Sequence, residues 1–152
     1  MYSRNSAQYT VRIFGGSMRY LLAFLLLVLS PVSFSCSCLH IPLKEHVNEA
    51  KAIYLGLLTG AKLVEEKEEW YIKAEFRVEE VLKGNVSKKT TVKTGVGGGD
   101  CGIPMTVGKP YMIFFESEKY YVGTCGASGI VHRHQEKEYI QMLKNIIHEQ
   151  KI

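Results

Sequence analysis

The sequence predicts a mostly β domain with flanking helices: a five-stranded OB-fold barrel, with one short helix before the barrel and one C-terminal helix. Three observations lead to this fold class. Five strand-like segments follow one another between residues 52 and 124, and helical patterns stand only before and after them. One strand shifts its apolar alternation part-way along, which indicates the curvature that small barrels need. The number of strands alone would fit other small barrels as well.

The first predicted elements are a short helix and a strand. Leu43, Val47 and Ala50 recur at helical spacing and indicate one apolar helix face. The run Ala52–Leu58 is a strand candidate, and Gly56 within it indicates a bend or a bulge.

The clearest strand is the second. Apolar and polar residues alternate from Tyr71 to Val78, as they do in a strand with one solvated face. After Val78 the next apolar residue is Val81, three positions later instead of two, so the alternation shifts by one residue. We therefore expect a β-bulge at Glu79-Glu80. The acidic run Glu65–Glu69 before this strand is interpreted as a solvated hairpin tip.

The remaining elements follow from shorter patterns. Lys89–Thr94 is rich in β-branched residues and predicts a third strand, and the glycine-rich Gly95–Gly102 predicts a loop. These glycines do not open a helix after a strand in a phosphate-binding pattern, so we expect no nucleotide site. Pro110–Glu116 and Tyr120–Thr124 are the last two strand candidates. Lys137–Glu149 carries its apolar residues on one helical face, which we expect to pack on the outside or the end of the barrel.

Residues 1–35 have the layout of a secretory signal peptide. They contain three arginines and no acidic residue, and Tyr20–Leu29 is an apolar run of ten residues before Pro31. Ten residues are too few for a membrane-spanning helix, which needs about 20. Small residues precede Cys36, so we expect cleavage after Ser35, with Met18 as an alternative start. The predicted mature domain is 36–152, and we expect it to be secreted, extracellular or periplasmic.

The charge of the predicted mature domain is nearly balanced. Subtracting the three arginines of residues 1–35 from the 19 basic residues leaves 16, against 15 acidic residues. This balance gives no support for a nucleic-acid partner or an acidic membrane surface. A lipoprotein is the competing interpretation, because a cysteine directly after a cut is a lipidation site. Lipidation normally requires a large aliphatic residue where this chain has Ser33, and it would acylate the α-amine of Cys36.

Four cysteines lie in the predicted mature domain, at Cys36, Cys38, Cys101 and Cys125. An even number in a small exported domain predicts two disulfides. A bridge between Cys36 and Cys38 would strain the chain, and the sequence leaves the other two pairings open. A zinc site made of thiolates is the competing interpretation, but the cysteine spacing does not match the usual paired motif.

Several of these motifs together resemble a known family. Cys36-Ser37-Cys38 directly follows the predicted cut, Asp100-Cys101-Gly102 precedes Val107-Gly108 and a strand, and Thr124-Cys125 precedes the last helix. In order and spacing the chain resembles the tissue inhibitors of metalloproteinases (TIMP), in a single-domain form of their netrin-like (NTR) inhibitory domain. The resemblance covers nearly the whole predicted mature domain. We expect a single domain, without the second, cysteine-rich domain of the animal proteins and without the third disulfide of their inhibitory domain.

The resemblance implies disulfides between Cys36 and Cys101 and between Cys38 and Cys125. It also implies an inhibitory wedge made of Cys36, Ser37, Cys38 and Leu39. In that mechanism the amine and carbonyl of mature Cys36 bind the catalytic zinc of a target metalloprotease, and Ser37 enters its specificity pocket. Segments around Leu39–Leu43 and Val96–Asp100 would flank the contact.

No arrangement of residues in the sequence indicates an active site, so we expect the protein not to be an enzyme. We expect no cofactor of its own, since the zinc belongs to the target, and a monomer without membrane attachment unless Cys36 is lipidated. The alternative function is a non-inhibitory binding module, exported or lipid-anchored. The pair His132 and His134 has no evident acidic or cysteine partner and is interpreted as part of a solvated linker.

Overall fold

The computed structural model describes residues 20, 24, 36–97, 99–116 and 121–150. The chain divides into two units, Met1–Phe34 and Ser35–Ile152, and the fold described below is that of the second. Apart from Tyr20 and Phe24, the predicted signal peptide lies outside the described residues. No helix within the described ranges is both long and apolar enough to cross a bilayer.

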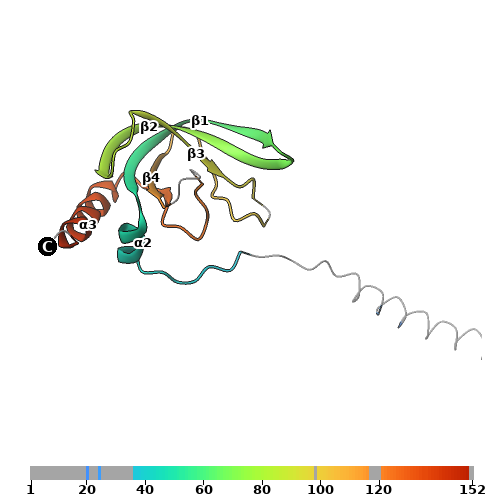
Figure 1. The fold of residues 1–152 in the computed structure, drawn as a ribbon, viewed down its shortest axis with the longest axis horizontal. Coiled ribbons are helices and arrows are strands. Elements are labelled where there is room, and N and C mark those ends of the chain that lie inside the picture. The colour runs from blue at the N-terminus through green and yellow to red at the C-terminus, as the bar shows by residue number, and fades with distance from the viewer. Residues whose placement is uncertain (1–19, 21–23, 25–35, 98, 117–120, 151–152) are drawn as a thin grey trace, which may run out of the picture. The chain divides into compact units, whose positions relative to one another are not determined.

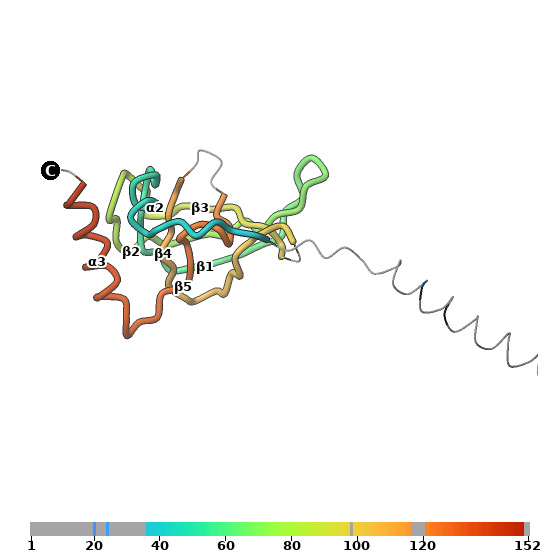
Figure 2. Tube along the Cα trace, turned by 90° about the horizontal axis from the view of Figure 1, so that it is seen from below, coloured from blue at the N-terminus to red at the C-terminus, as the bar shows by residue number. Residues whose placement is uncertain are grey.

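The second unit is a five-stranded antiparallel sheet with two helices (Figures 1 and 2). In chain order the elements are α2 (Leu43–Glu49), β1 (Ala52–Glu66), β2 (Glu69–Lys83), β3 (Lys89–Thr94), β4 (Pro110–Phe115), β5 (Gly129–Ile130) and α3 (Glu136–Glu149). The strands lie in the order β3-β2-β1-β4-β5, with antiparallel pairing between neighbours. The mostly β class and the two flanking helices are therefore as the sequence predicts.

The sheet differs from the expected barrel in two ways. It is open, because β3 and β5 form its two edges instead of pairing with each other. The fifth strand is Gly129–Ile130, whereas the prediction placed it at Tyr120–Thr124. In that segment Tyr121 and Gly123 form only isolated bridges, and Tyr120 is outside the described residues. The segment bonds to β3 and to the loop after it, and so it does not join β4 as a regular strand.

The predicted bulge in β2 is confirmed by its pairing with β1. Leu55 lies opposite Glu80 and Gly56 lies opposite Val78, which leaves Glu79 as an extra residue. Two further register shifts occur along the same pair of strands. Bulges bend a strand and increase its twist, which accounts for the strong curl of β1 and β2 in Figure 1.

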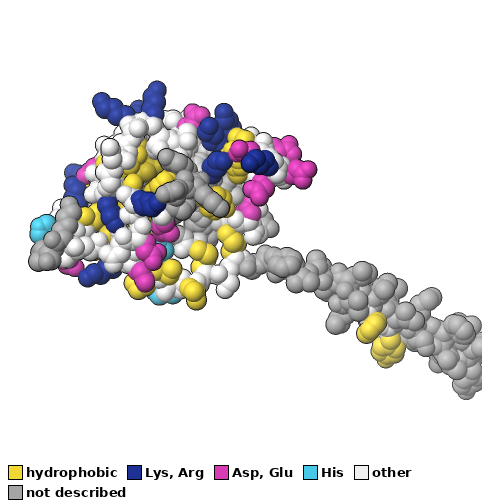
Figure 3. All heavy atoms as spheres, viewed as in Figure 1, with side chains coloured by type: hydrophobic (Ala, Val, Ile, Leu, Met, Phe, Trp, Pro, Cys, Tyr) yellow, Lys and Arg dark blue, Asp and Glu magenta, His cyan; other side chains and the backbone are white. Residues whose placement is uncertain are grey.

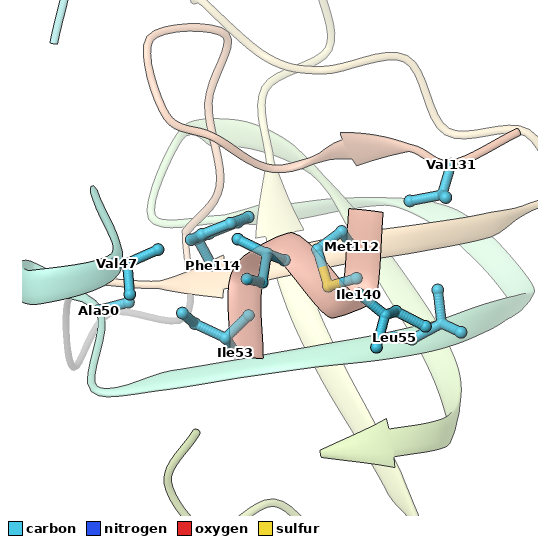
Figure 4. Packing of buried hydrophobic residues seen from close by; sticks show 9 residues of the cluster. Val47, Ala50, Ile53, Leu55, Met112, Phe114, Val131 and Ile140 are labelled. Atoms are coloured by element: carbon cyan, nitrogen blue, oxygen red, sulfur yellow. The ribbon is translucent and has the colours of Figure 1, made fainter. Parts of the chain in front are cut away.

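Two apolar clusters pack against opposite faces of the sheet. The inner cluster lies in the hollow of the curved sheet and comprises Tyr54, Leu58, Ala74, Phe76, Val92, Ile103, Tyr111, Ile113 and Val122. The outer cluster joins both helices to β1 and β4 (Figure 4) and comprises Val47, Ala50, Ile53, Leu55, Met112, Phe114, Val131, Ile140 and Leu143. The last helix was expected on the outside or the end of a barrel, and it packs on the outer face of the open sheet.

Helix α2 is attached to the sheet by polar contacts as well. The ammonium of Lys83 donates to the carbonyl oxygens of Val47 at 2.6 Å and Asn48 at 3.0 Å, near the C-terminus of the helix. A cation stabilises that end of a helix. His46 is only 7% exposed, and its Nδ1 lies 2.9 Å from a carboxylate oxygen of Glu116. These contacts hold the C-terminal half of α2 against the sheet, and α2 follows the segment that leads in from Cys36.

Candidate functional site

The segment from Cys36 to Leu39 lies on the surface and belongs to no helix or strand. Cys36 is half-buried, Ser37 and Cys38 are exposed, and the Leu39 side chain is 86% exposed. In Figure 2 the segment, in cyan, leads from α2 towards the loop that follows β3. All four residues predicted for the inhibitory wedge are therefore accessible to a partner.

Two disulfides hold this segment at both of its cysteines. Cys36 is bonded to Cys101, with 5.6 Å between their Cα atoms, and Cys38 is bonded to Cys125, with 5.2 Å. This is the pairing that the resemblance implies. No cysteine remains free, so the alternative of a zinc site made of thiolates is wrong for this structure. The bridges attach one tripeptide to two separate segments of the chain.

The loop that carries Cys101 is folded around the carboxylate of Asp100. This carboxylate accepts the backbone N–H groups of Val96, of Gly97 at 2.9 Å and of Gly102 at 3.2 Å. Desolvation opposes ionisation of Asp100, but these bonds outweigh it and hold the pKa of the carboxyl below its ordinary value. The negative charge of Asp100 thus stabilises the loop shape.

The loop is also packed too closely to accept larger residues at two of its glycines. A Cβ atom on Gly102 would lie 2.3 Å from the carbonyl oxygen of Gly95, and one on Gly95 would lie 2.3 Å from the Asp100 carboxylate. Between them, Cys101 has a positive φ of 58°, a left-handed conformation that non-glycine residues seldom adopt. The buried Thr94 closes the loop, because its hydroxyl accepts the N–H of Ile103 at 2.8 Å.

A third segment completes the site. Tyr121 donates its hydroxyl proton to the carbonyl oxygen of Asp100 at 2.9 Å. The hydroxyl of Thr124 lies 3.0 Å from the carbonyl oxygen of Cys101 and 2.8 Å from that of Gly102. Both sulfurs of the Cys36–Cys101 bridge contact the carbonyl oxygen of Gly99, at 3.7 and 3.8 Å. These sulfurs carry no proton, so the contacts are of the van der Waals kind.

The structure therefore brings together three segments that the sequence separates: the tripeptide, the loop after β3 and the residues before β5. Sequence reasoning identified the cysteines and the flanking loop. It missed the roles of Asp100, Tyr121 and Thr124. Asp100 had a local signal, because an aspartate beside glycines commonly bonds nearby backbone N–H groups. Tyr121 and Thr124 had none, since they act across the fold.

The surface around the tripeptide is apolar at its edges. Leu39, Val96 and Tyr121, one from each of the three segments, are exposed by 86%, 47% and 42%. Among the described residues, no group of three or more His, Cys, Asp or Glu side chains is placed to hold a metal ion.

No protein-family model and no curated protein sequence matches this chain at a significant level.

Proposed function

We propose that the protein is an exported inhibitor of zinc metalloproteases. Signal cleavage after Ser35 would make Cys36 the first residue. Its free α-amine and its carbonyl oxygen would then bind the catalytic zinc of the target enzyme, and Ser37 would point into the specificity pocket beside that zinc.

The chemistry of a catalytic zinc suits this pair of ligands. Such a zinc has three protein ligands and keeps its fourth position for water or substrate, and it accepts a fifth ligand in the course of reaction. An amine and a carbonyl from one residue can occupy these positions and displace the attacking water. An α-amine has an ordinary pKa of about 8, and only its neutral form binds a metal. Inhibition should therefore weaken as the pH falls.

The single observation that carries the proposal is the double attachment of an exposed tripeptide. Cys36 and Cys38 are tied to Cys101 and Cys125, which lie on different segments, and the residue between them is exposed. A rigid binding segment loses little conformational entropy on association, and this loss otherwise weakens binding by about 0.5–1.5 kcal/mol for each flexible side chain. A segment held in this way suits insertion into a cleft.

The proposal extends to the fold. An OB-fold is a five-stranded, partly open barrel. Two observations support a barrel of this kind with a netrin-like arrangement. The first is the strand order. The second is the parallel bridge between Lys93 of β3 and Tyr121, which spans the two sides of the opening. The two disulfides support an extracellular location, because such bonds persist in oxidising compartments.

The test is an extension of the chain by one residue. The exported protein is first analysed by intact mass and N-terminal sequencing, which should show an unmodified Cys36 as the first residue. Inhibition is then measured against a panel of zinc metalloproteases. An alanine added before Cys36 should abolish inhibition, whereas an alanine added after Ile152 should leave it unchanged.

Inhibition that survives the N-terminal alanine would show that Cys36 does not bind the zinc. An acylated Cys36, or an exported chain that retains residues before it, would favour the alternative of a lipid-anchored or non-inhibitory binding module.

A further inference from the structure

The pairing of β1, β2 and β3 places basic side chains from distant parts of the sequence on one face of the sheet. Ala74, Phe76 and Val92 point from β2 and β3 into the inner core. Residues adjacent to them in sequence point to the opposite face, because side chains alternate along a strand. The basic residues of that face, called here the basic face, are Lys62, Lys73, Arg77, Lys89 and Lys93.

The basic face has like charges directly opposite each other. Lys73 lies opposite Lys62 on β1 and opposite Lys93 on β3, so one row across three strands consists of lysines. Four residues further along β2, Arg77 lies opposite Lys89. Like charges in such positions destabilise a sheet. The arrangement therefore has an energetic cost that the fold does not require.

Acidic neighbours offset only part of this charge. Lys93 bonds to Glu66 at 3.1 Å and Arg77 to Glu79 at 3.3 Å. Lys62, Lys73 and Lys89 have no ion pair among the residues that the structure describes. One acidic residue, Glu75, lies between the two basic rows, and the hairpin tip beyond the lysine row is acidic.

The space between the basic rows is hollowed. A depression of about 720 Å³ lies over β2 and β3, and it is lined in part by Thr59, Glu75, Arg77, Lys89 and Thr91. The lysine row spans about 10 Å across three strands, and the second row lies about 13 Å along the strands from the first. In Figure 3, some of the Lys and Arg side chains (dark blue) lie along the upper margin, over the region of β1–β3 in Figure 1, with acidic side chains (magenta) beside them. Charges repeated at this spacing suit a linear chain of anions.

We propose that the basic face binds an acidic polysaccharide. The two disulfides are consistent with an extracellular location, where such polymers occur and nucleic acids are scarce. The face has little aromatic surface for stacking bases, since the ring of Tyr71 is covered by the Lys93 ammonium at 4.2 Å. A flat membrane is a poor fit to a strongly curled sheet, whereas a flexible polymer follows it. This binding is independent of the inhibitor function proposed above.

The experiment uses heparin as the probe polymer and compares two triple variants of the exported protein. The test variant carries Lys62→Gln, Lys73→Gln and Lys89→Gln on the basic face. The matched control carries Lys44→Gln, Lys109→Gln and Lys137→Gln, which are exposed lysines elsewhere and change the net charge equally. Binding is measured by calorimetry at several salt concentrations, with circular dichroism as the check on folding.

We expect the wild type to bind heparin with an affinity that falls as salt rises. The test variant should bind at least tenfold more weakly, and the control should change by less than threefold. The test variant should also unfold at a temperature no lower than that of the wild type, because its substitutions remove opposed like charges. A merely structural role for these lysines would give the opposite thermal shift.

Three results would overturn the proposal. The first is the absence of heparin binding at low salt. The second is an equal loss of binding in both variants, which would show a non-specific charge effect. The third is tighter binding to single-stranded DNA, or to vesicles containing phosphatidylglycerol, than to heparin, which would assign the face to a nucleic acid or to a membrane.

Discussion

The carbonyl oxygen of Cys101 accepts a hydrogen bond from the backbone N–H of Thr124 at 2.7 Å, and the Thr124 hydroxyl lies 3.0 Å from the same oxygen. Cys101 is the partner of Cys36, and Thr124 precedes Cys125, the partner of Cys38. The two disulfides are therefore coupled through a direct contact between the segments that they join. The rigidity of the tripeptide depends on this contact as well as on the sulfur bridges.

Replacing Thr124 by valine tests the coupling. The substitution keeps the shape of the side chain but removes the hydroxyl that bonds the carbonyl groups of Cys101 and Gly102. We expect the free energy of unfolding to fall by about 1 kcal/mol, measured by urea denaturation. Thr106→Val, at another exposed threonine, is the control and should change stability by less. Equal effects of the two substitutions would contradict the importance of this contact.

The Asp100 carboxylate predicts a pH dependence of stability. Its pKa is lowered in the folded protein, so its contribution is fully present above the unfolded pKa, about 4, and is lost as the pH falls through the lower folded value. We expect Asp100→Asn to destabilise the protein at neutral pH and the difference from wild type to shrink in acid. Urea denaturation between about pH 7 and pH 2 measures this difference.

Glu65→Gln, at an exposed carboxylate in the hairpin, serves as the control for the Asp100 experiment. A difference between wild type and Asp100→Asn that stays constant down to the lowest pH would show that the charge of Asp100 does not hold the loop.

The turn between β1 and β2 offers a stabilising substitution. Lys67 and Glu68 form its two-residue loop, and both have positive φ, 53° and 66°. Asparagine followed by glycine is the preferred sequence for such a turn. Replacing both residues by Asn-Gly should raise the free energy of unfolding by about 1 kcal/mol, because the left-handed conformation becomes less costly.

The double substitution removes one positive and one negative charge, so it leaves the net charge of the protein unchanged. Lys67→Asn alone should give a smaller gain. Thermal denaturation of both variants checks this order, and a double variant no more stable than wild type would contradict the prediction.

The second disulfide should contribute much of the total stability. Cys38 and Cys125 are separated by 87 residues, and a bridge over a loop of this length contributes about 4.6 kcal/mol in the chain-entropy account. We expect Cys38→Ala with Cys125→Ala to lose a large part of this amount and to weaken inhibition. Ser37→Ala, which keeps both bridges, is the control for stability. A double variant as stable as the control would show that hydrogen bonds alone hold the tripeptide.

Much of the fold was predictable where the local pattern and the tertiary structure agree. The predicted strand Lys89–Thr94 has the same bounds as β3. The shift in the alternation of apolar residues after Val78 correctly indicated the bulge in β2. The extension of β1 past Leu58 was not predictable, because its later residues are mostly exposed and are held by pairing with β2. Strand β5 has only two residues, which are too few to show an alternation of apolar and polar side chains. Its extended conformation depends on its pairing with β4.

The candidate site was predictable from its cysteines but not from the groups that support it. The motif around Cys36 and Cys38 is visible in a single line of sequence. The bonds of Thr124 and Tyr121 join residues more than 20 positions apart, and a sequence pattern carries no signal for them. The basic face was hidden for a similar reason, because its lysines come together only through strand register, within a chain whose overall charge is nearly balanced.

The first half of β1 is covered by an apolar cluster on each of its faces. Ile53 and Leu55 belong to the outer cluster, and Tyr54 and Leu58 belong to the inner one. Neither cluster can come apart without exposing this strand, so its amide hydrogens should be the slowest to exchange with solvent. Since α2 lies between this strand and the segment that carries the tripeptide, the exposed wedge is anchored to the part of the fold that should open least often.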